Sequence, residues 1–187
     1  MSQPLEHSWP PLQPQNHAFA AYWQGKRAGD APPPKAAIEP AEIPRLLPDL
    51  VIYERLAPDN FRIRLVGTGI VARVGMDPTG KNLLELMAYD SAERARVALG
   101  RVLDAPCAHV AVVRDQFASG REAFVELLRL PLTDKDSQPR FIVGCTVELR
   151  AMRHPPLEDQ PVRLAQTVQD WFVALDAALP DEPAPAG

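Results

Sequence analysis

Several charged and polar side chains lie within stretches of apolar residues that read as strands. Arg64, Arg114 and Glu126 occupy such positions, and His109 opens one of these stretches. Polar anchors set among apolar walls are typical of a small-molecule site. The same positions also arise on a solvated sheet face or in cross-strand ion pairs, so that interpretation stays open. With Thr68 from a turn after a predicted strand, the candidate ligand-binding residues are Arg64, Thr68, His109, Arg114 and Glu126.

Residue types that support catalysis or metal binding are present but are not grouped. The four histidines are scattered along the chain, whereas a zinc or iron site requires clustered ligands. Ser119 lies in a turn between two predicted strands, whereas a nucleophile elbow joins a strand to a helix. An enzyme would need a polar pair such as Tyr53 and Asp115 to converge in a cavity, and the sequence gives no sign of it. We therefore expect no enzymatic activity and no metal site.

One glycine pattern resembles a nucleotide-binding motif. Gly67-x-Gly69-x-x-Ala72 follows a predicted strand, as in the loose form of the dinucleotide fingerprint. That motif requires a doubly buried parallel strand and a long helix. Here the strand carries charged residues, and Gly75 and Pro78 interrupt the helix. We interpret the glycines as turn residues.

The composition favours one soluble globular domain. The chain has 187 residues, a hydrophobic share of 46% and a net charge of -4. It can therefore bury a core, and it has no global basic field to attract nucleic acid or an anionic membrane. It has no run of about 18 apolar residues and no signal-peptide pattern. Its two cysteines fit no disulfide framework and are expected to be buried and reduced. We expect a cytoplasmic protein without nucleic-acid or membrane partners.

The elements that must position these residues form an α+β pattern. A short helical crossing is predicted over 81–103, between an early pair of strands and a later set of three. Short connections join the strands within each group, which implies antiparallel neighbours. The predicted strands are 50–54, 61–66, 109–116, 122–132 and 140–149.

Helices are expected at both ends of the chain. Residues 1–15 are rich in Pro, Gln and Ser and are predicted to be disordered. A short aromatic helix follows and ends before three consecutive prolines. Apolar residues at 4-3-4 spacing predict an amphipathic helix over 156–180, and a disordered tail at 181–187.

These terminal helices hold much of the aromatic content of the chain. Aromatic residues are enriched in the cores of protein interfaces. The alternative is that the helices dock on the sheet of their own chain, and both can occur together. The candidate interface residues are Phe19, Tyr22, Trp23, Trp171 and Phe172.

The order and spacing of several motifs resemble a PAS-like domain family of α-proteobacterial regulatory proteins. The likeness covers about residues 17–150, and no single motif carries it alone. The motifs are Ile43-Pro44-x-Leu46-Leu47-Pro48, Phe61-x-x-Arg64-Leu65-Val66-Gly67-Thr68, Gly75-x-Asp77-x-Thr79-Gly80, the pair Tyr22-Trp23, and Leu130-Pro131-Leu132.

The resemblance implies a PAS-like sheet of five antiparallel strands, with the helical crossing on one face and flanking N- and C-terminal helices. We assign the domain with its leading helix to 16–150. Residues 81–103 contain neither a cysteine for a flavin photosensor nor a histidine for a haem sensor, so no cofactor is expected.

The resemblance implies a sensory or regulatory module that binds a small ligand or a protein partner, usually as a homodimer. Because the sequence ends soon after its predicted C-terminal helix, we expect the module to bind a small ligand and to signal to a regulatory protein partner in trans. The alternative is a protein-interaction scaffold with a filled core and no ligand. We expect a cavity between the sheet and the crossing helices, with at least one buried polar group, and such a cavity would distinguish a ligand-binding module from a scaffold with a filled core.

Overall fold

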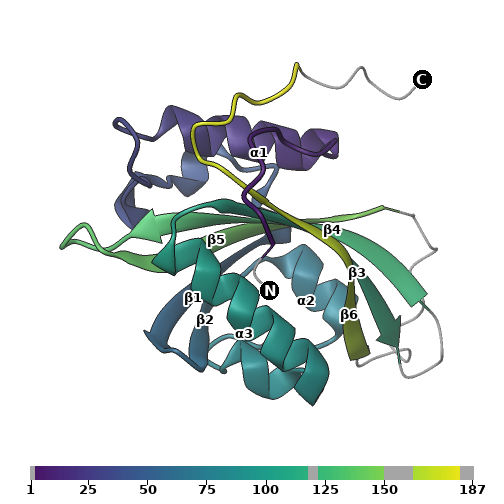
Figure 1. The fold of residues 1–187 in the computed structure, drawn as a ribbon. Coiled ribbons are helices and arrows are strands. Elements are labelled where there is room, and N and C mark those ends of the chain that lie inside the picture. Colours follow the sequence, from purple (N-terminus) through teal and green to yellow (C-terminus); the bar gives the residue numbers. More distant parts are fainter. Residues whose placement is uncertain (1–2, 118–121, 150–161, 182–187) are drawn as a thin grey trace.

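A six-stranded antiparallel sheet forms the centre of the computed structural model, which describes residues 3–117, 122–149 and 162–181. Across the sheet the strands follow the order β2-β1-β5-β4-β3-β6 (Figure 1). The predicted α+β fold is confirmed, with one strand more than expected. The strands are β1 (Leu50–Ala57), β2 (Asn60–Val66), β3 (Ala108–Phe117), β4 (Glu122–Thr133), β5 (Pro139–Glu148) and β6 (Val162–Val173).

Helices cover both faces of this sheet. In Figure 1 α1 lies above the sheet, and α2 and α3 lie below it. We call these two sides the α1 face and the crossing face. The α-helices are α1 (Pro14–Gly25), α2 (Thr68–Val74) and α3 (Tyr89–Asp104). The single 3-10 turns are η1 (Lys35–Ala37), η2 (Pro40–Glu42), η3 (Leu47–Asp49) and η4 (Leu83–Leu86).

Alternation along the strands assigns each side chain to one face. In β4, Leu128 and Leu130 are fully buried in the core under α1, whereas Leu127 and Arg129 line a cavity on the crossing face. Successive strand residues point to opposite faces, so the two faces can differ in chemistry. Here the α1 face is closed by apolar packing, and the crossing face is not.

Hydrogen bonds to β4 fix the position of α1. The fully buried Trp23 donates from Nε1 to the carbonyl of Pro131 at 3.1 Å. The Glu126 carboxylate accepts from the backbone N–H of Gln13 at 2.9 Å and from Asn16 Nδ2 at 2.8 Å. A carboxylate at a helix N-terminus satisfies N–H groups that lack a partner within the helix. Glu126 therefore anchors α1.

The segment before α1 is ordered, contrary to the predicted disorder of residues 1–15. Trp9 and Leu12 are buried in the core of the α1 face. Trp9 Nε1 donates to the carbonyl of Ala177 at 3.1 Å, and Glu6 forms a parallel bridge with Val173. The two ends of the described chain therefore pack against each other, and the apolar residues among the prolines outweigh the polar composition.

The C-terminal segment is a strand, which corrects the predicted helix at 156–180. Residues 162–173 form β6 and pair antiparallel with β3, with Trp171 opposite Val110 and Phe172 opposite His109. After β6, the described chain continues without a helix to Asp181. The start of the predicted helix and the tail at 182–187 lie outside the described residues.

Two properties explain why the segment becomes a strand. Its residues 167–173 include a threonine, two valines and two aromatic residues, which pack well on a pleated surface. Without β6, strand β3 would also expose a row of unpaired backbone groups at the edge of the sheet. The spacing of the apolar residues alone could not show either effect.

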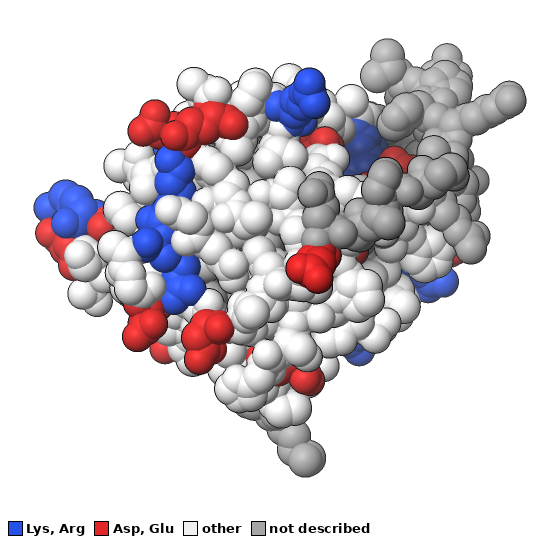
Figure 2. Space-filling model, turned by 90° about the horizontal axis from the view of Figure 1, so that it is seen from above, with Lys and Arg blue, Asp and Glu red and all other residues white. Residues whose placement is uncertain are grey.

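The surface on the side of α1 carries charges of both signs. Figure 2 shows a column of lysine and arginine side chains on the left of this face, with acidic residues above and below it and mostly uncharged residues beside it. Among the described helices, none has the length and apolar character needed to cross a membrane.

Candidate functional site

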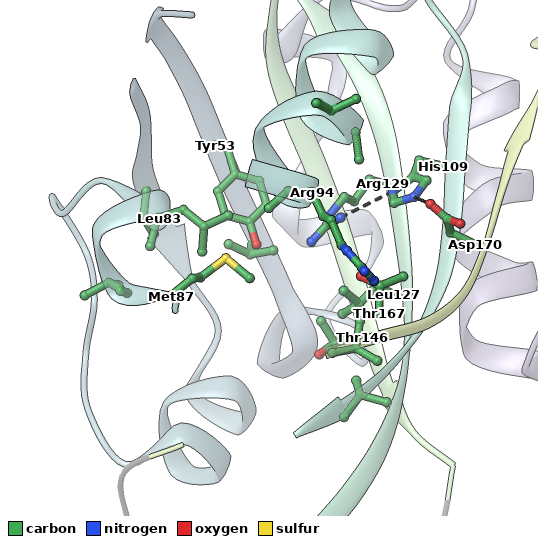
Figure 3. Close-up of a pocket in the computed structure, with 18 of the residues that line it drawn as sticks. Tyr53, Leu83, Met87, Arg94, His109, Leu127, Arg129, Thr146, Thr167 and Asp170 are labelled. Carbon is green, nitrogen blue, oxygen red and sulfur yellow. Dashed lines mark hydrogen bonds and ion pairs between the residues drawn. The ribbon is translucent and has the colours of Figure 1, made fainter. Parts of the chain in front are cut away.

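A cavity of about 1010 Å³ lies between the crossing face and the helices α2, η4 and α3 (Figure 3). Its volume is at the upper end of the range for small-molecule sites. The sheet supplies one wall and the helices supply the other. Most of the lining is apolar and includes Ile63, Val74, Leu83, Met87, Val113 and Phe172.

A row of polar side chains crosses the sheet wall of this cavity from β1 to β6. Arg129 Nη1 donates a hydrogen bond to His109 Nδ1 at 3.3 Å, and the guanidinium lies beside the Tyr53 hydroxyl. His109 Nε2 lies 3.3 Å from Asp170 Oδ2. His109 and Arg129 are direct neighbours in the pairing of β3 with β4, so the sheet register itself assembles the row.

The tautomer of His109 follows from its neighbours. An arginine can only donate, so Nδ1 of His109 must accept and the ring proton must be on Nε2. The proton on Nε2 is then donated to Asp170. Asp170 thus orients the ring, and the ring presents an acceptor to Arg129.

Burial keeps His109 uncharged. Its pKa falls from 6.5 to about 4, chiefly because the ring is desolvated, and Arg129 and Arg101 lower it further. The hydrogen bond to Asp170 acts in the opposite direction. The same hydrogen bond, as the largest cause, lowers the pKa of Asp170. At neutral pH the row therefore holds a carboxylate, a neutral imidazole and a guanidinium.

A second polar group lies where α2 meets the sheet. Arg73 Nη1 is 3.8 Å from Asp115 Oδ2, and Arg73 Nη2 donates to Thr146 Oγ1 at 3.4 Å. Burial raises the pKa of Asp115, while Arg73 lowers it. Tyr53 and Asp115 both line the cavity. Tyr53 lies beside Arg129 and Asp115 beside Arg73, and no hydrogen bond between Tyr53 and Asp115 is found among the described residues.

His109 is expected to make folding stability fall as the pH drops from 6.5 toward 4. The unfolded chain takes up a proton at this residue near pH 6.5, and the folded protein does so only near pH 4. Unfolding is therefore coupled to proton uptake between these values. Above pH 6.5 the difference in pKa contributes about 3 kcal/mol to the free energy of unfolding, and this contribution is lost as the pH falls to 4. Urea unfolding of the native protein and of the His109→Gln variant, from pH 7 to pH 4, measures this contribution.

Two controls isolate this contribution. Asp115 and Glu126 have raised pKa values because they are buried, so they favour the folded state as the pH falls, but both are present in native and variant protein. The exposed His7 supplies a matched variant, His7→Gln, which should follow the native curve. If the His109→Gln curve also runs parallel to the native curve, the assignment is wrong.

Of the candidate ligand-binding residues, the structure places His109 at the cavity, and the other four do not line it. Arg64 forms an ion pair with Glu54 on the strand pair β1–β2. Arg114 donates to Gln166 at 2.7 Å, and Thr68 is exposed at the start of α2. Glu126 is on the α1 face. The alternation of the sheet separates these side chains.

Three of the five candidate interface residues are buried within the chain itself. Phe19 and Trp23 are fully buried under α1. Phe172 stacks on His109 at 4.6 Å between ring centroids, and the guanidinium of Arg101 lies 4.0 Å from the centre of the Phe172 ring. Tyr22 and Trp171 are partly exposed. Intramolecular docking, the alternative weighed from the sequence, therefore accounts for most of this set.

Arg129 and Asp170 were not identified as site residues from the sequence, although the sequence contains a signal for Arg129. Arg129 stands between leucines in a predicted strand, as Arg64 stands among apolar residues in β2. Asp170 was missed because its segment was predicted as a helix. No group of three metal-ligating side chains is found in the described part of the chain.

Comparison with known proteins identifies the family of this chain. The family model described as PAS domain matches residues 12–147. No curated protein matches the sequence.

Several solved light-oxygen-voltage (LOV) structures match this chain at low sequence identity. One LOV domain, studied with a flavin analogue, is 16% identical with a TM-score of 0.47, over 59% of this chain and 84% of its own. The LOV protein of Rhodobacter sphaeroides is 16% identical with a TM-score of 0.45, over 74% of this chain and 70% of its own. A LOV domain of a blue-light-activated histidine kinase from Erythrobacter litoralis is 22% identical with a TM-score of 0.41, over 54% of this chain and 94% of its own. Through the match over residues 12–147, this chain belongs to the PAS domain family.

Proposed function

We propose that this PAS domain is a sensory module that binds a small molecule in the cavity of the crossing face and regulates a protein partner in trans. The cavity is the observation that supports this proposal. Its volume of about 1010 Å³ would accommodate a ligand, and its apolar walls with a few converging polar groups have the make-up of ligand sites. A scaffold with a filled core, the alternative, would have no need of such a space.

The helix α3 is suited to report on the content of the cavity. Ala95 and Ala98 on α3 line the cavity and are buried. On the same helix Tyr89 is 85% exposed. A rigid helix that touches a ligand on one side and solvent on the other can transmit a displacement to a bound protein. We further propose that the module acts in the cytoplasm as a homodimer and without catalysis.

Native mass spectrometry of the protein purified from its own organism tests the binding proposal. We expect an added mass of a few hundred daltons on the native chain, within the usual size of ligands for such a cavity. Leu127→Trp should abolish the added mass because it places an indole in the cavity beside Arg129. The same spectra report whether the chain is a dimer.

Leu65→Trp is the matched control. Leu65 is 42% exposed and does not line the cavity, so this variant should keep the ligand. A native chain without added mass in repeated preparations, or a Leu127→Trp chain that retains it, would favour the scaffold.

A further inference from the structure

Arg129 is a buried cation that faces the cavity. Its side chain comes from the middle of β4, and the residue is only 9% exposed. Figure 3 shows it between Tyr53 and His109 at the centre of the sheet wall. Among the described residues, no carboxylate forms an ion pair with it. Because burial disfavours the charged form, the pKa of Arg129 is lowered.

The hydrogen-bonding capacity of this guanidinium is largely unused. It offers five N–H donors, and among the described residues His109 Nδ1 accepts from one of them. The Tyr53 hydroxyl lies beside this guanidinium and carries a hydrogen that it can donate to a ligand. Burial raises the pKa of Tyr53, which keeps that hydrogen in place. Arg129 and Tyr53 thus present neighbouring donors.

The acidic residues around the cavity have other partners. Asp170 is held behind the imidazole of His109, and Asp115 is paired with Arg73. At the rim, Glu93 pairs with Arg96 and Asp104 pairs with Arg55. None of these pairs neutralises Arg129 by direct contact.

The remaining cations at the cavity reinforce its positive character. Arg101 lies at its rim, over the ring of Phe172 at 4.0 Å. Figure 3 shows Arg94 from α3 in front of Arg129. Neither arginine has a carboxylate partner among the described residues, so an anion that enters the cavity meets Arg94 and Arg101 as well as Arg129, with the Asp170 carboxylate set behind the ring of His109.

Stability alone does not account for an arginine at this place. A buried charge without a direct counter-ion is costly, and an apolar residue of similar volume is often as good or better for folding. The neighbours on the crossing face, Val125 and Leu127, show that apolar side chains fit there. A planar guanidinium with free paired donors is instead suited to bind a carboxylate with two parallel hydrogen bonds.

We propose that the ligand of this cavity is an amphipathic carboxylate, with its anionic head on Arg129 and Tyr53 and an apolar body between the sheet and α2, η4 and α3. This inference rests on the proposed function and adds the chemical class of the ligand. His109 and Asp170 act as positioning residues, because they hold the guanidinium toward the cavity.

Three probes that share one apolar body test the head group. Octanoate, octanamide and octylamine carry an anionic, a neutral and a cationic head group, and isothermal titration calorimetry gives their Kd values for the native protein. We expect octanoate to bind at least about 10-fold more tightly than octanamide, as for a charge-assisted hydrogen-bonded pair. Octylamine should bind most weakly.

Variants of Arg129 show whether that residue is responsible. Arg129→Met should remove the preference for octanoate, a loss of about 10-fold or more, and leave octanamide affinity unchanged. Retained octanamide binding also shows that this variant is folded. Arg129→Lys should recover part of the preference, because it keeps the charge without the planar fork. Arg45→Met, at an exposed position outside the cavity, is the matched control and should bind as the native protein does.

The outcomes separate this inference from the proposal on which it rests. Equal affinities for octanoate and octanamide, or an unchanged preference in Arg129→Met, would overturn the carboxylate and leave the ligand-binding module intact. Failure of all three probes to bind would count against both.

Discussion

Replacing Trp23 with alanine is expected to lower the free energy of unfolding by about 3–5 kcal/mol, the range for removing a buried tryptophan. Trp23 is fully buried between α1 and β4, and its indole N–H donates to the carbonyl of Pro131. The variant would lose the packing and would also leave that carbonyl without its partner. A domain has about 5–15 kcal/mol of stability in total, so the variant would be close to unfolded at moderate temperature. Urea unfolding followed by far-ultraviolet circular dichroism measures the change.

Two further variants identify the source of the loss. Trp23→Phe keeps most of the volume but not the N–H donor, so its loss should be clearly smaller than that of alanine. Tyr89→Ala removes an aromatic ring that is 85% exposed and should change stability by less than about 0.5 kcal/mol. A loss below about 1 kcal/mol for Trp23→Ala would mean that α1 does not hold the sheet as described.

The role of Trp23 shows what the sequence could and could not tell about α1. The aromatic residues indicated that the helix must dock on something, because a short helix is unstable alone. They did not indicate whether the partner was the chain itself or a second copy. That choice depends on which face of the sheet is apolar, and Leu128 and Leu130 on β4 decide it.

The five strands β1 to β5 were predictable because each has local evidence. β-branched and aromatic residues mark them, and turn residues separate them. β6 has the same types of residue, but its apolar spacing also fits a helix, and its partner β3 is far away in the sequence. Pairing over such a distance leaves no local trace. The spacing of apolar residues therefore could not decide the number of strands, or whether Trp171 lies on a helix at an interface.

The candidate site was predictable only in part, for a reason of register. A strand turns alternate residues to opposite faces, so a shift of one position moves a side chain from the cavity to the far side of the sheet. Glu126 and Arg129 are three positions apart in β4, and they lie on opposite faces. His109 was identified, but the sequence alone could not show that its neighbour on the next strand would be Arg129.

The Gly67-x-Gly69 pattern, which resembled a nucleotide-binding turn, has a packing explanation. A side-chain carbon at Gly67 would lie 2.2 Å from the carbonyl oxygen of Leu47 and 2.3 Å from that of Pro48. At Gly69 it would lie 2.8 Å from a carboxylate oxygen of Asp49. The start of α2 therefore touches the backbone of η3. Because Gly67 and Gly69 have no side chains, the start of α2 can make this close contact, which holds α2 in the wall of the cavity.

Replacing Gly67 with alanine is therefore expected to destabilise the fold by about 3 kcal/mol, the upper end of the usual cost of overpacking. The obstructing atoms belong to the backbone of η3, so they cannot rotate away as a flexible side chain could. Either η3 or α2 must move, and the hydrogen bond from Gly67 N–H to the Leu50 carbonyl, at 2.7 Å, would be strained. Urea unfolding of the native and variant proteins measures the loss.

Gly100 in the middle of α3 provides the opposite case in the same chain. A side-chain carbon there would meet only a carboxylate oxygen of Asp104 at 3.7 Å, an ordinary contact. Because glycine inside a helix costs conformational entropy, Gly100→Ala should stabilise the protein by about 0.5–1 kcal/mol. Opposite signs for the two substitutions would show that close backbone contact, and not the loss of glycine flexibility, determines the effect at Gly67. A Gly67→Ala protein as stable as the native one would mean that α2 does not rest on η3, and the helical wall of the cavity would then lack its support.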